Sequence, residues 1–323
     1  MGALPAEISE KIRIGTCSWT DKTLIKSGFY PASASTPASR LAHYAAFFNT
    51  VEVDSTYYAM PDPGNIFRWI AGTPKNFTFG VKSFSLFTFH RAKFTALPNW
   101  LRAELLAGSG GAPSEAPALV RREDLTSDQR KRLFEEFINP VRILHNSGRL
   151  AYLLFQFPPY WKFSKEGLVY FKRLREVSGP MPLAVEVRDN SWFTPGNGER
   201  FTDALRAENI AYTAVDEPDI GWTLGPVWPV TSEWGTLARF HGRNKAGWRN
   251  LRASIYERFD YEYDTFELEE WIGRIENVRG AKVIYLMYNN CVDDKAVNSA
   301  LMMKEILGLS GEKSRRYRQK NLI

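Results

Sequence analysis

The sequence is poor in cysteine and histidine. Two cysteines in 323 residues exclude the disulfide framework of small secreted domains and any cysteine-rich zinc site. The four histidines form neither an HxH nor an HxxxH pair, so a multi-histidine metal cluster is excluded as well. We predict no cofactor, while a divalent ion held by the carboxylates of Glu186 and Asp216 stays open as an alternative.

Long apolar runs are also missing. No stretch reaches the roughly 18–20 apolar residues that a membrane helix needs, and the start, MGALPAEISEK, lacks the basic-then-apolar pattern of a secretory signal. We expect a cytoplasmic protein with no membrane partner. A nuclear location is the alternative, because the chain ends in a basic segment. The sequence does not indicate an oligomeric state.

The net charge of +6 is concentrated at one end. The segment EKSRRYRQK (312–320) has five basic residues and one acidic residue, so it carries +4 of the +6. The rest of the chain is nearly balanced. Because basic terminal segments are usually solvated and disordered, we predict that 309–323 is a disordered tail. The net charge therefore does not by itself indicate nucleic-acid binding.

Eight short runs of β-branched and aromatic residues recur along the chain, and such runs predict strands. They are IRIGTCS (12–18), TVEVDS (50–55), FTFGVKS (77–83), LAYLLFQF (150–157), LAVEVR (183–188), IAYTAVD (210–216), TLARFHG (236–242) and KVIYLMYN (282–289).

Helical patterns fill most of the gaps between these runs. Leu41, Tyr44 and Phe48 form one apolar stripe, and Asp62-Pro63 is typical of an N-cap followed by proline in the first turn. Strands that alternate with helices predict a parallel sheet, and eight such units predict a single α/β (β/α)₈ TIM barrel. A doubly wound open sheet is the alternative, but no strand is followed by its GxGxxG turn.

The barrel is predicted over residues 12–308, after an N-terminal extension at 1–11 and before the tail at 309–323. Between the third and fourth strands lies an insertion at about 84–126, in which GSGGAPSEAP (108–117) is typical of a flexible loop. Between the sixth and seventh strands, residues 217–235 contain three prolines and no helical period. One helix is therefore predicted to be reduced or missing there.

Polar side chains share faces of the predicted strands, because alternate residues of a strand point the same way. The shared faces carry Glu52 with Asp54, Lys82 with Thr78 and Gly80, Glu186 with Arg188, and Arg239 with His241 and Arg243. The opposite faces are apolar, as expected beneath helices, so the polar sets are predicted to point into the barrel. They also crowd toward the C-terminal strand ends, the face where barrels of this kind place their active sites.

We predict an acid/base site at this mouth. Glu186 and Asp216 would be the general base and acid, and His241 a proton shuttle. The substrate-binding candidates are Glu52, Asp54, Lys82, Gln156, Arg188, Arg239, Arg243, Asn289 and Asn290, with the aromatic residues Trp19, Tyr57, Trp192 and Trp248 placed to stack on a ring.

Each of these candidates also fits a structural role. A buried pair between Arg188 and Glu52 can simply stabilise the barrel. Asp216, directly ahead of Glu217-Pro218, also suits a turn or cap. The loop aromatics also suit packing of the loops.

Several blocks of the sequence resemble one known family. They are GTCSW (15–19), FYP (29–31), FFNTVEVDSTYY (47–58), TPKNFTFGVK (73–82), LLFQFPP (153–159), AVEVRDNSW (184–192), RFHGR (239–243) and YNN (288–290). These blocks are similar to the domain of unknown function 72 family, also called YecE-like. The resemblance implies a TIM-barrel fold and no established activity. Cys17-Ser18-Trp19-Thr20 departs from the Ser-Gly-Trp-Ser that members often have.

The site suggests an isomerase, lyase or hydrolase acting on a small anionic, ring-containing molecule such as a phosphosugar or nucleotide fragment. One alternative is a nucleic-acid processing or repair barrel, although such enzymes hold their metals with several histidines. The other is a ligand-binding barrel without turnover.

Overall fold

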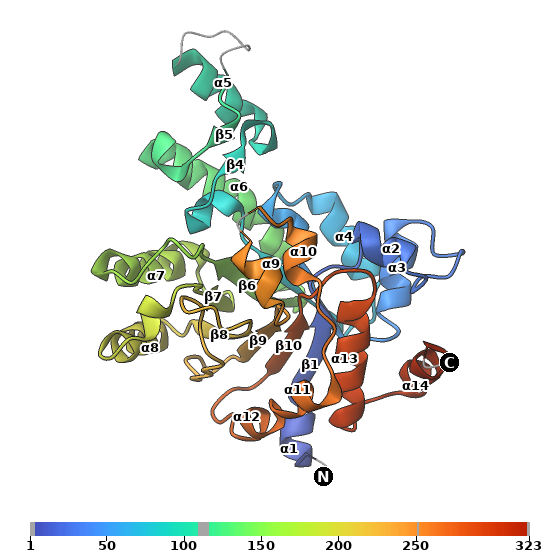
Figure 1. The fold of residues 1–323 in the computed structure, drawn as a ribbon. Helices are drawn as coiled ribbons and strands as arrows, with labels where there is room; N and C mark the ends of the chain where they lie inside the picture. Colours follow the sequence, from blue (N-terminus) through green and yellow to red (C-terminus); the bar gives the residue numbers. More distant parts are fainter. Residues whose placement is uncertain (1–3, 109–115, 251, 322–323) are drawn as a thin grey trace.

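A computed structural model describes residues 4–108, 116–250 and 252–321, and it confirms all eight predicted strands. They are β1 (Ile12–Thr16), β2 (Thr50–Val53), β3 (Thr78–Lys82), β6 (Leu150–Gln156), β7 (Leu183–Glu186), β8 (Ala211–Asp216), β9 (Thr236–Phe240) and β10 (Ile284–Tyr288). The sheet order is β1-β10-β9-β8-β7-β6-β3-β2, and every ladder within it is parallel. The predicted (β/α)₈ barrel is therefore confirmed (Figure 1).

Helices cover the outside of the strands. They are α3 (Pro37–Tyr44), α4 (Pro63–Ala71), α6 (Ser127–Asn146), α7 (Lys165–Ser178), α8 (Asn197–Ala207), α11 (Thr265–Glu269), α12 (Ile272–Glu276) and α13 (Lys295–Ile306). Asp62 caps α4 as predicted, because its carboxylate accepts a hydrogen bond from the Asn65 amide at 2.7 Å. No helix forms in 217–235, which confirms the missing helix. None of the helices described is long and apolar enough to cross a bilayer.

β1 and β2 are the first and last strands in the order of the sheet. Side chains bridge the two strands and so complete the barrel. The Tyr44 hydroxyl accepts from the backbone amide of Thr16 at 2.7 Å and donates to the carbonyl of Thr50 at 3.2 Å. The Asn49 side chain accepts from the amide of Ile14 at 3.2 Å. Two side chains thus satisfy backbone groups that a strand ladder would otherwise pair.

Two apolar clusters fill the barrel wall and its interior. The larger one joins the helices to the outer faces of the strands, and the smaller one lies in the lumen around Tyr152, Leu237 and Met287. Gly80 makes room for Tyr152, because a Cβ at this position would lie 2.4 Å from the tyrosine ring. The lumen is a packed core below the mouth.

The predicted insertion at 84–126 contains its own short elements, and it extends away from the barrel (Figure 1). It comprises the 3₁₀ turn η2 (Ser85–Thr88), the antiparallel pair β4 (Ala92–Lys93) and β5 (Leu119–Val120), the turns η3 (Phe94–Ala96) and η5 (Arg122–Asp124), and helix α5 (Asn99–Gly108). Most of the predicted flexible loop, residues 109–115, lies outside the described part of the chain.

The prediction of a disordered C-terminal tail is wrong. Residues Glu312–Asn321 form helix α14, which lies beside α13 (Figure 1). The Tyr317 ring packs edge-on against Phe29 and Phe47, at centroid distances of 5.5 and 5.7 Å. Its hydroxyl donates to Asp294 at 3.0 Å. Lys313 of the same helix also lies over the Phe47 ring, at 5.0 Å. Side chains within the basic run thus pack on the barrel, which the charge count could not reveal.

Candidate functional site

Arg239 lies at the centre of the barrel mouth and is fully buried. Its Nη1 donates to Glu186 at 2.6 Å and its Nη2 donates to Glu52 at 2.5 Å. Both carboxylates are buried as well. Since a buried charge is costly unless it is paired, these three residues from β2, β7 and β9 depend on one another.

The network continues toward the opening of the barrel. Arg188 Nε lies 2.5 Å from Glu186 Oε1, and Arg188 Nη1 donates to Glu217 at 3.2 Å. Burial would raise the pKa of Glu186, but the charges of Arg188 and Arg239 outweigh it and hold that pKa well below the usual value. Glu186 is therefore ionised at neutral pH and is committed to three cationic or hydrogen-bonding neighbours.

His241 is held by hydrogen bonds on both ring nitrogens. The Asn289 amide donates to Nδ1 at 3.0 Å, so the hydrogen is on Nε2, which faces Glu186 at 3.2 Å. Burial, together with the nearby charge of Arg188, lowers the pKa of His241 to about 3. The imidazole is neutral at physiological pH, and it orients Glu186.

Asp54 and Lys82 form the more open side of the mouth. Lys82 Nζ lies 3.8 Å from Asp54 Oδ1, and the two side chains are 13% and 25% exposed. Burial raises the pKa of Asp54 to about 7, and the negative charge of Glu52 adds to the rise. Lys82 also lies 4.9 Å from the centre of the Tyr57 ring. The structure thus brings these three predicted binding residues together.

Gln156 and Trp248 also reach the cluster. The Gln156 side chain accepts from Arg239 at 3.4 Å. The Trp248 ring lies 5.4 Å from the guanidinium of Arg188 and 6.4 Å from the His241 ring. These two residues, together with the groups described above, form what we call the mouth cluster: Glu52, Asp54, Lys82, Gln156, Glu186, Arg188, Glu217, Arg239, His241, Trp248 and Asn289.

Glu217 was missed as a site residue by sequence reasoning. Its Oε1 accepts from the Leu224 amide at 3.0 Å, its Oε2 faces Arg188, and burial raises its pKa to about 7. The alternation of side chains along β8 indicates its position. Ala211, at the start of β8, lies in the lumen cluster. Every second residue after it points the same way, so Glu217 is expected to point inward.

Asp216 and Arg243 do not join the mouth cluster, contrary to the prediction. Asp216 is on the opposite face of β8, where its carboxylate accepts from Arg243 at 2.9 and 2.7 Å, from Tyr263 at 2.8 Å and from Trp271 at 2.7 Å. Arg243 follows Gly242, whose φ of +85° redirects the chain after the strand. With four donors the Asp216 carboxylate is saturated. It cannot share an ion with Glu186 across the sheet.

Trp19, Trp192 and Asn290 are also away from the mouth cluster. Trp19 is buried against Trp69 and donates to the Pro37 carbonyl at 3.2 Å. Trp192 is fully buried and stacks on Trp161 at 4.7 Å. The Asn290 amide donates to the Tyr261 carbonyl at 2.9 Å and to Ser299 at 3.2 Å. All three predicted binding residues therefore stabilise the loops and the wall.

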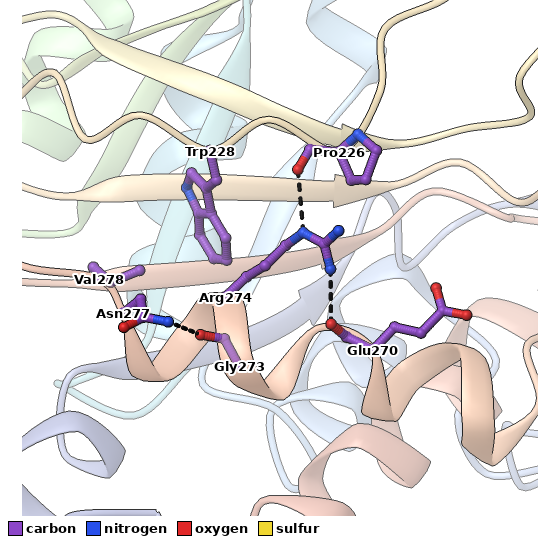
Figure 2. Close-up of a pocket in the computed structure, with 7 residues that line it drawn as sticks. All are labelled: Pro226, Trp228, Glu270, Gly273, Arg274, Asn277 and Val278. Carbon is purple, nitrogen blue, oxygen red and sulfur yellow. Dashed lines mark hydrogen bonds between the residues drawn. The ribbon is translucent and has the colours of Figure 1, made fainter.

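Within the described residues, no three His, Cys, Asp or Glu side chains are grouped so as to hold a metal ion. A separate hollow of about 360 Å³ lies beside α12 (Figure 2). Its cation, Arg274, donates to the carbonyls of Pro226 at 3.1 Å and Glu270 at 2.8 Å. Backbone oxygens thus already engage that guanidinium, and we do not include this hollow in the site.

A family model described as protein of unknown function DUF72 matches residues 13–321. A curated relative, the UPF0759 protein YunF of Bacillus subtilis (strain 168), is 30% identical over 306 residues, which are 92% of this chain and 95% of the relative.

Two solved structures of DUF72 family proteins are similar throughout. One from Enterococcus faecalis V583 has a TM-score of 0.72 and 26% identity, covering 93% of this chain and 97% of its own. One from Thermotoga maritima MSB8 has a TM-score of 0.70 and 29% identity, covering 92% of this chain and 99% of its own. Neither description states an activity.

Proposed function

Because this chain belongs to the DUF72 family, whose description assigns no function, we propose a function from its own mouth cluster: binding of a small anion, followed by acid/base chemistry on it. The reaction class is that of an isomerase, lyase or hydrolase. One observation carries the proposal. Lys82 lies beside the partly exposed Asp54, and Arg188 lies beside the buried Glu217; both carboxyl groups have pKa values of about 7, which suit proton transfer at neutral pH.

Lys82 and Arg188 have donors to spare. Nη1 of Arg188 donates to Glu217, and its Nε forms an ion pair with Glu186 without a hydrogen bond, while its Nη2 donates to no described residue. Lys82 has a single carboxylate neighbour, and at 3.8 Å this lies beyond hydrogen-bond distance. A phosphate or carboxylate would take up these donors with charge-assisted hydrogen bonds.

We assign proton transfer to Asp54 and Glu217 and a positioning role to Glu186 and His241. A general acid or base works best when its pKa lies near the working pH. Asp54 and Glu217 meet this condition, whereas Glu186 and His241 have pKa values far below it. This assignment replaces the base and shuttle expected from the sequence, and it leaves Asp216 to hold Arg243, Tyr263 and Trp271.

Calorimetric titration with ribose 5-phosphate tests the proposal. K82Q and R188Q should each weaken binding about tenfold, the usual effect of losing one charge-assisted hydrogen bond. R206Q is the matched control, because Arg206 is an exposed cation on α8 paired with Asp203. K82Q is the more informative variant, since Lys82 is the less buried of the two cations.

Equal binding by wild type, K82Q and R188Q would contradict the anion site. Product analysis after incubation separates an enzyme from a binding protein. A bound phosphosugar that is recovered unchanged, without exchange of its carbon-bound hydrogen in D₂O, would favour a barrel that binds without turnover.

A further inference from the structure

A groove of about 690 Å³ lies where the segment 84–126 meets the loop after β6. Its lining residues are Tyr57, Phe89, His90, Arg91, Arg121, Glu123, Tyr160 and Trp161. Tyr57 also contacts Lys82 of the mouth cluster, so this residue borders both the groove and the mouth.

His90 lies at the junction between groove and mouth. Its ring packs edge-on against Tyr57 at 5.3 Å and faces Tyr160 at 6.5 Å. Burial, with added effects from the charges of Lys82 and Arg188, lowers the pKa of His90 to about 4. The Tyr57 ring that contacts His90 also lies 4.9 Å from Lys82, which places the inner end of the groove beside that cation.

Tyr160 presents a free aromatic face at the outer end of the groove. Its side chain is 64% exposed, yet its hydroxyl donates to the Phe89 carbonyl at 2.9 Å. Phe89 has a left-handed backbone, with φ of +61°, which is unfavourable for a non-glycine residue. This turn directs the carbonyl to Tyr160 while the Phe89 ring stacks on Trp161 at 5.5 Å. The exposed ring is therefore held in place before any ligand arrives.

We propose that this groove binds the planar ring of the anion whose charged group lies at Lys82 and Arg188, which makes the ligand a nucleoside monophosphate or a similar aryl-bearing anion. This inference rests on the proposed function and narrows it. Four aromatic rings, those of Tyr57, Phe89, Tyr160 and Trp161, line the groove together with the guanidiniums of Arg91 and Arg121, and both kinds of group can stack on a base. A bare sugar phosphate would leave these surfaces uncovered.

The test compares adenosine 5′-monophosphate with ribose 5-phosphate by calorimetry. Wild type should bind the nucleotide about five- to hundredfold more tightly, the range expected for stacking one base on an aromatic side chain. Y160A should remove most of this advantage and leave ribose 5-phosphate binding within about twofold of wild type. Y160F keeps the aromatic ring but loses the hydrogen bond to the Phe89 carbonyl. Its affinity for adenosine 5′-monophosphate should therefore lie between those of wild type and Y160A.

F67A is the matched control, because Phe67 is an aromatic residue of α4 that is 59% exposed and lies outside the groove. Wild type that binds both compounds equally, or Y160A that weakens both equally, would overturn the groove assignment and leave the anion site standing. Wild type that binds neither compound would overturn both proposals. Near-ultraviolet circular dichroism verifies that each variant is folded.

Discussion

Arg239 donates to two buried carboxylates at the same time, one on each side of the lumen. Its planar guanidinium offers several donors in a fixed geometry, which a lysine ammonium does not. The result is a chain of alternating charge, Glu52–Arg239–Glu186–Arg188–Glu217, that connects β2, β9 and β7 to the residue after β8. The inner residues fix the outer ones, so Arg188 is held in position with one nitrogen still available.

Asp54 should make stability depend on pH. Its pKa is about 7 in the folded chain and near its ordinary value of 3.8 when unfolded. Between these values the folded protein holds a proton that the unfolded chain has lost, so the free energy of unfolding falls as pH rises from 4 to 7. D54N cannot ionise, and its stability relative to wild type should therefore rise across that interval.

Urea unfolding of both proteins at pH 4 and pH 8 measures this difference. Between pH 4 and pH 8, the free energy of unfolding of D54N should rise by about 1–2 kcal/mol relative to that of wild type. The pKa shift alone would give more, but solvent screens part of the effect at a side chain that is 25% exposed. D203N is the control for loss of a surface carboxylate. A gain for D54N that is the same at both pH values would show that Asp54 does not titrate in this range.

The sequence allowed part of the mouth cluster to be predicted, because inward and outward residues alternate along a strand. That rule placed Glu52, Glu186 and Arg239 correctly. It failed for Arg243, where the left-handed Gly242 ends the alternation. Along β8 the same rule favours Glu217 over Asp216, because Ala211 lies in the lumen cluster. His90 could not be found this way, since it lies on no barrel strand and the fold of the segment after β3 brings its ring against Tyr57, next to Lys82.

At the scale of elements, the strands could be predicted because each is a short apolar run between turn-forming residues. The β1–β2 seam could not, since it depends on a tyrosine hydroxyl from α3. Nor could the docking of α14, because the dense charge of that segment suggests solvation, whereas Tyr317 and Lys313 both pack against Phe47.

Removal of the Tyr44 hydroxyl should destabilise the barrel. Y44F leaves the Thr16 amide and the Thr50 carbonyl without their partner in a buried seam, which typically costs about 1–3 kcal/mol. Y212F is a matched control, because Tyr212 is fully buried and its hydroxyl has no partner among the described residues. Guanidinium unfolding should show a clear loss for Y44F and little change for Y212F. Equal losses would mean that the seam does not depend on Tyr44.

At the scale of the whole molecule, the excess positive charge lies apart from the mouth. Residues 312–320 carry +4 of the net +6, and they belong to α14, on the flank beside α13 (Figure 1). The mouth cluster, by contrast, pairs most of its cations with carboxylates. A long polyanion would therefore be attracted to the flank rather than to the mouth.

Any binding of duplex DNA should accordingly be weak and should depend on α14. Fluorescence anisotropy should show it largely lost between 50 and 200 mM salt, because phosphate contacts of this kind release counterions. Deleting residues 312–323 should abolish it while adenosine 5′-monophosphate still binds. Tight DNA binding that survives the deletion would instead support the nucleic-acid processing alternative.

The groove has two walls of different origin. Tyr57, Tyr160 and Trp161 come from loops that follow barrel strands, whereas Phe89, His90, Arg91, Arg121 and Glu123 come from the excursion between β3 and α6. The excursion adds no strand to the eight-stranded sheet. A change in the length or sequence of this excursion would therefore alter one wall of the groove and leave the strands that carry the mouth cluster in place, so the two parts of the molecule can change separately.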